Sequence, residues 1–435
     1  MNVRRLIIVL GLAGFIVMAD NWVVSPLLPS IGRAFSVDPA RAGVLIAAYM
    51  LPFGLFQLLY GPLADRFGKL RVVMVSLVLF TVATGLCATA VGLADLAAFR
   101  ALTGVFAAAT MPVSLALIGD LVPMKERQKA IAGFMGIAFL GQATSMTIGG
   151  TIAAAFSWRG VFIAYAGVAV VIVVALYLSA RDVRKQLHGD PHSQFVRPYG
   201  RLLGHGPSLR TYLIVFVEGL LILGSFSDAG AYAAKALGLG TFGIGLLMAV
   251  FGVGVIAASR LSGRLAQRFG RPRLVALGLV SAAAADLIVA GWGSHLSAFA
   301  IAVLLLGLGF MFAHSSLLTT ATQFAEKSRG AAMSLVAFAF MVGGSVGTML
   351  GGRIVLTASY RDMYIAYGAA LLVTSGLALI AIPAQRALSR PTALPMPKLE
   401  AGGPDPGEGV VALRARVLRP QGAGTPGPWT PAPHS

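Results

Sequence analysis

The stretch Gly61–Arg71, Gly-Pro-Leu-Ala-Asp-Arg-Phe-Gly-Lys-Leu-Arg, is a short charged segment between two long apolar runs. It occurs a second time, in altered form, as Gly263–Arg273, Gly-Arg-Leu-Ala-Gln-Arg-Phe-Gly-Arg-Pro-Arg. The offset between the copies is 202 positions (263 − 61), close to half of the hydrophobic part of the chain. Identical positions include Leu63 and Leu265, Ala64 and Ala266, Arg66 and Arg268, Phe67 and Phe269, Gly68 and Gly270, and Arg71 and Arg273. A loop repeated this closely predicts that the segments around it are repeated as well.

The composition is that of a membrane protein. The chain has 435 residues, of which 57% are hydrophobic and 11% charged, and its mean hydropathy is +0.82. A soluble domain carries about 25% charged residues. The net charge of +18 lies in short loops and not in one patch. Loops enriched in Lys and Arg on the cytoplasmic side explain this charge better than a nucleic-acid surface does. We therefore expect a lipid bilayer as a partner and no nucleic acid.

The sequence contains no catalytic or metal-binding constellation. Its single cysteine, Cys87, excludes an intramolecular disulfide and a cysteine metal site, and its six histidines lack metal-ligand spacing. No Gly-x-x-x-x-Gly-Lys-Ser/Thr loop is present to bind ATP. We expect no enzyme activity, no cofactor and no metal, and an ion gradient as the source of energy.

Twelve apolar stretches have the length of a membrane span, about 20 residues. They should be helices, because the bilayer core offers no water to satisfy backbone groups. The first is interpreted as an uncleaved span, since no small-x-small cleavage site follows it. The stretches cover residues 6–28, 42–62, 72–91, 95–119, 130–155, 159–180, 211–232, 242–263, 274–293, 296–320, 330–354 and 362–383.

The distribution of Lys and Arg predicts that both termini are cytoplasmic, because alternate loops carry most of these residues. The longest internal connection, with six basic residues, separates two sets of six spans. After Pro383 the chain is rich in Pro, Gly and Ala, which predicts disorder. The predicted domains are a six-helix bundle (1–180), a cytoplasmic linker (181–210), a second six-helix bundle (211–384) and a cytoplasmic tail (385–435). The predicted location is the plasma membrane, which is the inner membrane in a Gram-negative bacterium.

The repeat continues beyond the opening loop at the same offset. Ile163-Ala164-Tyr165 recurs as Ile365-Ala366-Tyr367, and Gly141, Gly149 and Gly150 recur as Gly343, Gly351 and Gly352. Two parallel halves joined by a basic loop are typical of a transporter built from repeats, with its site where the halves meet.

The chain resembles the major facilitator superfamily of transporters over residues 6–383. Gly61–Arg71 matches the signature between helices 2 and 3 of that superfamily, Gly-x-Leu-Ala-Asp-Arg-x-Gly-Arg/Lys-x-Arg. Arg100 with Thr103-Gly104 resembles its helix-4 motif, and Asp20, nine residues before Pro29, resembles the helix-1 motif of drug/proton antiporters. The antiporter motif of helix 5, Gly-x-x-x-Gly-Pro-x-x-Gly-Gly, is altered, because Ser145-Met146 stands in place of its Gly-Pro.

The resemblance implies a cytoplasmic latch at the repeated loop. Asp65 would accept hydrogen bonds from a facing helix N-terminus or from Arg127 when the inner side is closed. A solvated turn that only follows the positive-inside rule is the alternative. Gln267 replaces this aspartate in the second copy, which predicts an asymmetric latch. The predicted latch residues are Gly61, Asp65, Arg66, Gly68, Lys69, Arg71 and Arg127.

Charged residues inside spans cost about 2.5–3.5 kcal/mol each on insertion scales, so each needs a reason. Asp20 falls about 21 Å along the first span, within the roughly 30 Å core, where a carboxyl can exchange protons near neutral pH. The alternatives are satisfaction by neighbouring helices and exposure near the outer mouth. Arg100 would pair with Asp20 or with an anionic substrate.

The second half offers its own polar candidates. Glu218 is a second buried acid, for a proton or a cation. His314 would titrate near neutral pH or hydrogen-bond, uncharged, to Ser315 or Thr319. Asp286 lies on a peripheral helix, and Asp228 lies near the outer mouth, where it can face water. The proton-coupling and substrate candidates are thus Asp20, Arg100, Glu218 and His314.

Three functions are compatible with these observations. The leading hypothesis is a monomeric secondary transporter that exports a small molecule, such as a drug or metabolite, in exchange for protons. The second is a proton-coupled uptake symporter or facilitator for a sugar or organic acid, which the altered helix-5 motif leaves open. The third is a membrane sensor or scaffold without transport activity. The sequence does not identify the substrate.

Overall fold

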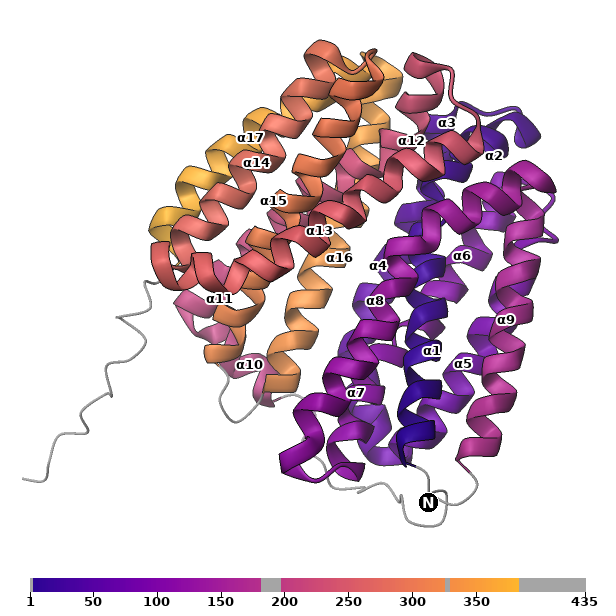
Figure 1. Ribbon diagram of the computed structural model, residues 1–435, viewed down its shortest axis with the longest axis vertical. Helices are drawn as coiled ribbons and strands as arrows, with labels where there is room; N and C mark the ends of the chain where they lie inside the picture. The colour runs from indigo at the N-terminus through magenta and orange to yellow at the C-terminus, as the bar shows by residue number, and fades with distance from the viewer. Residues whose placement is uncertain (1–2, 181–196, 325–328, 383–435) are drawn as a thin grey trace, which may run out of the picture. The chain divides into compact units, whose positions relative to one another are not determined.

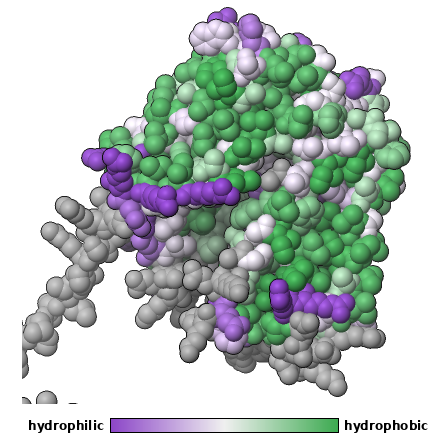
Figure 2. Space-filling model, viewed as in Figure 1, coloured by the Kyte–Doolittle hydropathy of each residue, from purple (hydrophilic) through white to green (hydrophobic). Residues whose placement is uncertain are grey.

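The computed structural model describes residues 3–180, 197–324 and 329–382, and in that part of the chain the regular structure is helical, without strands. Within these residues, eleven helical segments are long and apolar enough to cross a membrane. The bent pair Gly133–Gln142 and Thr144–Ala155 raises the number to twelve when it counts as one span. The expected all-α membrane fold of twelve spans is thereby confirmed. Hydrophobic residues cover most of the face in Figure 2, with hydrophilic residues gathered in a few patches.

The helices of the first half precede those of the second half along the chain, as the colours of Figure 1 show. The first half consists of α1 (Val3–Trp22), a 3-10 turn (Ser25–Leu27), α2 (Leu28–Phe35), α3 (Pro39–Ala42), α4 (Val44–Phe67), α5 (Lys69–Cys87), α6 (Leu93–Ala107), α7 (Thr110–Leu121), α8 (Met124–Ala155) and α9 (Trp158–Ser179). After α10 (Arg197–Gly204), the second half consists of α11 (Gly206–Glu218), a π-helical turn (Gly219–Leu223), α12 (Gly224–Leu237), α13 (Thr241–Phe269), α14 (Arg271–Trp292), α15 (Leu296–Gln323), α16 (Arg329–Thr357) and α17 (Tyr360–Ala381).

Two of the spans that carry polar candidates are interrupted close to them. In the first span, α1 ends at Trp22, two residues after Asp20, and Pro26 and Pro29 begin the next two helical pieces. Proline suits the first turn of a helix, where its missing N–H has no partner to lose. In the seventh span, α11 ends at Glu218 itself, and a π-helical turn follows. Such turns are frequent at functional sites, because they redirect the side chains around them.

The repeated loop has the same local structure in both halves. Gly68 and Gly270 end α4 and α13 with φ values of 91° and 82°, a backbone region that favours glycine. The guanidinium carbon of Arg66 lies 5.3 Å from the Phe67 ring centroid. In the second copy the distance from Arg268 to Phe269 is 5.4 Å. The glycine that both copies of the loop share is therefore explained by the positive φ of the turn that it makes.

The repeated glycines of helices 5 and 11 allow close helix packing. Gly141 of α8 lies against the backbone carbonyl of Phe15 in α1, and Gly343 of α16 lies against that of Phe216 in α11. A Cβ at either position would overlap that carbonyl, so a larger residue would push the helices apart.

The two halves are hydrogen-bonded to each other at the end where the first span finishes, which we call the far end. Here Ser25 Oγ donates to the carbonyl of Ser227 (3.2 Å), and Ser345 Oγ donates to that of Ala47 (3.1 Å). Thr147 Oγ1 also donates across the interface, to the carbonyl of Gly245 (3.4 Å). The opposite end, which carries the repeated charged loops, is called the basic end. There Tyr199 of α10 donates to the carbonyl of Leu58 (3.2 Å).

The predicted domain boundaries are only partly covered. The linker predicted at 181–210 is described from residue 197, and α11 begins at Gly206, earlier than the predicted start of the seventh span at 211. The predicted tail 385–435 lies outside the described residues, so the division into domains stays a prediction.

Candidate transport site

Asp20 of α1 and Arg100 of α6 form a buried ion pair. Arg100 Nη1 donates to Asp20 Oδ2 at 2.5 Å, and Arg100 Nη2 donates to the backbone carbonyl of Asp20 at 3.1 Å. Both side chains have zero exposure. The structure thus brings together two candidates that lie 80 positions apart in the sequence.

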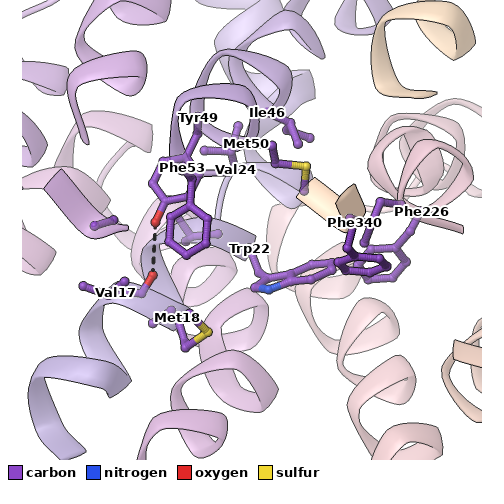
Figure 3. Close-up of a cluster of buried hydrophobic side chains, with 14 of the residues drawn as sticks. Val17, Met18, Trp22, Val24, Ile46, Tyr49, Met50, Phe53, Phe226 and Phe340 are labelled. Carbon is purple, nitrogen blue, oxygen red and sulfur yellow. Dashed lines mark hydrogen bonds between the residues drawn. The ribbon is translucent and has the colours of Figure 1, made fainter. Parts of the chain in front are cut away.

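Aromatic rings hold the guanidinium of Arg100 in place. Its central carbon lies 4.4 Å from the ring centroid of Tyr49 and 5.9 Å from that of Phe162, distances at which a cation interacts with a π face. Tyr49 stacks on Phe53 and donates to the carbonyl of Val17 (3.4 Å), as Figure 3 shows. The ion pair is therefore fixed by packing as well as by charge.

Not every polar atom of this cluster has a protein partner. Asp20 Oδ1, Arg100 Nε and both amide atoms of Asn21 are buried without a hydrogen bond within the described residues. Buried polar groups are normally paired, so these atoms leave capacity for a proton or a polar ligand group. They lie immediately before the break that ends α1.

Glu218 and His314 form the corresponding pair of the second half. His314 Nδ1 lies 3.2 Å from Glu218 Oε2, and Glu218 Oε1 has no hydrogen-bond partner in the described part of the chain. The Glu218 side chain has zero exposure, whereas that of His314 is 21% exposed. Glu218 is a partner of His314 that the sequence did not indicate, and Thr319, one of the partners considered, donates to the carbonyl of Ser315.

A row of aromatic rings runs from Trp22 of the first half into the second half. Trp22 lies 5.4 Å from Phe226 in α12, measured between ring centroids, and Phe226 lies 4.3 Å from Phe251 in α13. The row continues through Phe310 of α15 to Phe340 of α16, at 5.8 Å and 5.4 Å. Figure 3 shows the first-half end of this row beside the side chains of Met18 and Met50.

The aromatic row ends on His314, whose ring centroid lies 4.5 Å from that of Phe340 and 5.1 Å from that of Phe310. No motif in the sequence indicates this aromatic row. Its members come from five helices, and apolar aromatic residues in spans usually only pack.

The two remaining acids of the second half are both buried. Asp286 of α14 has 1% exposure. Asp228 of α12 has zero exposure, so the expectation that it faces water is wrong. The reason is that segments of both halves close over it at the far end, with Gly43 and Gly351 facing its carboxyl group.

The predicted latch residues lie at the basic end without an ion pair to the second half among the described residues. Lys69 Nζ lies 2.5 Å from Asp120 Oδ2 and 3.9 Å from Asp65 Oδ1, all within the first half. Arg127 Nε donates to the carbonyl of Val122 (3.4 Å). Asp65, Arg66 and Arg71 are exposed, and Gly61 and Gly68 flank them in the loop.

Within the residues that the structure describes, no cluster of three or more His, Cys, Asp or Glu side chains is placed to bind a metal ion.

The chain belongs to the Major Facilitator Superfamily, whose sequence profile matches residues 10–240 and 212–421. Its members are transporters that are generally not enzymes.

Similar proteins occur in several bacteria. An uncharacterised transporter of this superfamily from Bacillus subtilis, YceJ, is 25% identical over 83% of this chain and 92% of its own. The puromycin resistance protein pur8 of Streptomyces alboniger is 28% identical over 79% of this chain and 80% of its own. The multidrug resistance protein Stp of Mycobacterium tuberculosis is 33% identical, but over only 36% of this chain and 29% of its own.

A solved structure with the same fold is that of a bacterial homologue of the human lysosomal transporter Spinster, in an inward-facing and occupied conformation. It matches with a TM-score of 0.68 and 18% identity over 86% of this chain and 96% of its own.

Proposed function

We propose that this protein exports a small molecule in exchange for protons. The observation that carries the proposal is that each half holds a fully buried carboxyl group, Asp20 in the first half and Glu218 in the second, with an oxygen that lacks a hydrogen-bond partner among the described residues. Burying a carboxyl group within the membrane costs free energy, so such a residue indicates a functional site. Two such groups, one in each half, suit a protein whose halves rock around a central site.

The substrate would bind where the two halves meet, beside the aromatic row from Trp22 to Phe340. Flat rings and the flexible side chains of Met18 and Met50 favour an apolar, preferably aromatic, small molecule. The similarity to puromycin and multidrug resistance proteins supports export of such compounds.

The contacts between the halves support alternating access. The halves are hydrogen-bonded at the far end, through Ser25, Thr147 and Ser345, and the latch residues at the basic end are exposed. With the basic end in the cytoplasm, as the Lys and Arg distribution predicts, this arrangement corresponds to an inward-facing state. Protons entering from outside would then drive the return to this state.

The proposal is tested by drug susceptibility and drug accumulation in a bacterial strain that lacks its own efflux pumps. We expect cells with the wild-type protein to tolerate and to exclude at least one compound from a panel that includes puromycin. Asp20→Asn and Glu218→Gln should remove this protection at equal membrane abundance. Asp362→Asn, which changes an exposed carboxyl at the start of α17, is the matched control and should behave as wild type.

Two results would contradict proton-coupled export. Higher accumulation in cells with the wild-type protein would indicate uptake. Protection that survives a protonophore and both carboxyl substitutions would exclude the proton as the coupling ion.

A further inference from the structure

Asp228 lies where the two halves meet, and neither of its oxygens has a hydrogen-bond partner within the described part of the chain. A Cβ at Gly43, between α3 and α4 of the first half, would lie 3.7 Å from Oδ1. A Cβ at Gly351 of α16 would lie 3.1 Å from Oδ2. The carboxyl group is therefore enclosed by backbone from both halves.

The hydroxyl groups next to Asp228 are engaged elsewhere. Thr348 Oγ1 lies 2.9 Å from Ser227 Oγ and donates to the carbonyl of Gly344. Tyr367 donates to the carbonyl of Gly347 at 2.5 Å. An ionised Asp228 would thus be a buried charge without compensation, which is strongly unfavourable.

The charged surroundings make ionisation less favourable still. Asp38, which caps α3 through the N–H of Ala40, repels a negative charge on Asp228. Tyr364 and Tyr367 of α17 interact electrostatically with Asp228 and also with Asp286 of α14. Tyr360 of α17 interacts with Asp228 as well. The other charged side chains at this end, on α12 and on the segments packed against it, are exposed, namely Arg33, Arg41, Lys235, Arg353, Arg361 and Asp362.

We propose that Asp228 is a proton-binding site that holds the far end closed while it is protonated and lets that end open when the proton leaves. Separation of the halves would remove Gly43 from the carboxyl group and admit water, which stabilises the ionised form. The closed state therefore binds the proton more tightly than the open state, and acid favours closure.

This inference rests on the proposed topology, in which the far end faces the outside. The site then exchanges protons with the outside whenever the far end opens, because separation of the halves exposes the carboxyl group to external water. External acid would favour the inward-facing state, the direction in which a proton-driven exporter must return after releasing its substrate. Asp228 would thus act beside Asp20 and Glu218 without replacing them.

The test measures opening of the far end with spin labels on purified protein in nanodiscs, without substrate or gradient. In a Cys87→Ser background, Val91→Cys and Ser294→Cys report on the far end, and Leu178→Cys with Gln323→Cys report on the basic end. Val91, Leu178, Ser294 and Gln323 are all exposed. In the wild type the ratio of open to closed far ends should rise with pH, by up to about tenfold per pH unit, the limit for one proton.

Three variants decide the assignment. Asp228→Asn should keep the far end closed at every pH, and Asp286→Asn, a buried carboxyl inside the second half, should leave the pH response unchanged. Asp38→Asn retains an α3 cap but removes the repulsion, which stabilises ionised Asp228 in the closed state, so the far end should open less than in the wild type at alkaline pH. This third variant keeps the test decisive if Asp228→Asn does not fold.

The proposal is overturned if the wild type shows no pH response, if Asp228→Asn responds like the wild type, or if Asp38→Asn opens as far as the wild type at alkaline pH. Closure by Na⁺ at alkaline pH would assign the site to a metal cation instead. Because no transport is measured, failure of the export hypothesis leaves the result interpretable.

Discussion

The buried carboxyl groups of the two halves have different partners. In the first half, Asp20 faces Arg100, which keeps its charge at any physiological pH, and both side chains have zero exposure. In the second half, Glu218 faces His314, whose side chain is 21% exposed. The first pair contains a permanently charged arginine and is fully buried, whereas the second contains an ionisable histidine and is partly exposed.

This difference suggests that the Asp20–Arg100 pair stabilises the structure, whereas the Glu218–His314 pair exchanges protons. Protonation of Asp20 within its ion pair is costly, because Arg100 stays charged and buried when Asp20 is neutral. Glu218 and His314 can instead both be neutral and remain hydrogen-bonded. We infer that in this conformation protons exchange at Glu218 and His314, and that Asp20 takes part after the halves have moved.

The largest expected effect comes from breaking the permanent pair. Arg100→Gln leaves Asp20 buried without its cation, which should lower the free energy of unfolding by about 3–5 kcal/mol. The measurement is unfolding in mixed micelles with increasing sodium dodecyl sulfate. Combining Arg100→Gln with Asp20→Asn should restore much of the loss, because no uncompensated charge remains. A double variant no more stable than Arg100→Gln would contradict the pairing.

A smaller effect on stability is expected in the second half. Glu218→Gln keeps a side chain that hydrogen-bonds to neutral His314, so the free energy of unfolding should change by only about 1 kcal/mol. Drug export should nevertheless be lost, since the amide cannot bind a proton. If Glu218→Gln lowers the free energy of unfolding as much as Arg100→Gln does in the same titration, the two pairs contribute equally to stability and the distinction between them is contradicted.

Replacement of His314 should change the pH dependence more than the maximal rate. His314→Gln retains hydrogen-bonding capacity toward Glu218 but removes the ionisable imidazole. Export from membrane vesicles, measured at a constant pH difference, should then vary less steeply with pH than in the wild type. His314→Phe, which retains only the ring packing on Phe310 and Phe340, is the companion variant. A profile identical to wild type would remove His314 from proton exchange.

The smallest effect is expected at the basic end. Asp120→Asn removes the partly exposed partner of Lys69, and such pairs contribute about 0–1 kcal/mol. The free energy of unfolding should therefore stay within that range of the wild type. A loss as large as that at Arg100 would mean that the loop stabilises the fold and is not only a latch.

The sequence predicted what depends on local pattern and on repetition. The spans follow from hydropathy, and the loop glycines Gly68 and Gly270 follow from a repeat that the backbone geometry explains. The charges of Asp20, Arg100 and Glu218 stand out because membrane spans rarely carry them. These residues could be selected one by one, without knowledge of their neighbours.

What could not be predicted depends on contacts between distant helices. His314 reaches Glu218 across 96 positions, and the aromatic row joins residues that look like ordinary packing in the sequence. Asp228 was expected to face water because it lies near a helix end. Only the approach of Gly43, from the other half, explains why it is buried.

The most direct test of proton-coupled export is substrate flux in proteoliposomes under an imposed pH difference. With a compound identified in the cellular screen, acid on the far-end side should drive that compound toward the acidic side, against its own gradient. Glu218→Gln should abolish this uphill movement while the protein remains folded. Flux of the wild-type protein that is indifferent to the pH difference would contradict the account.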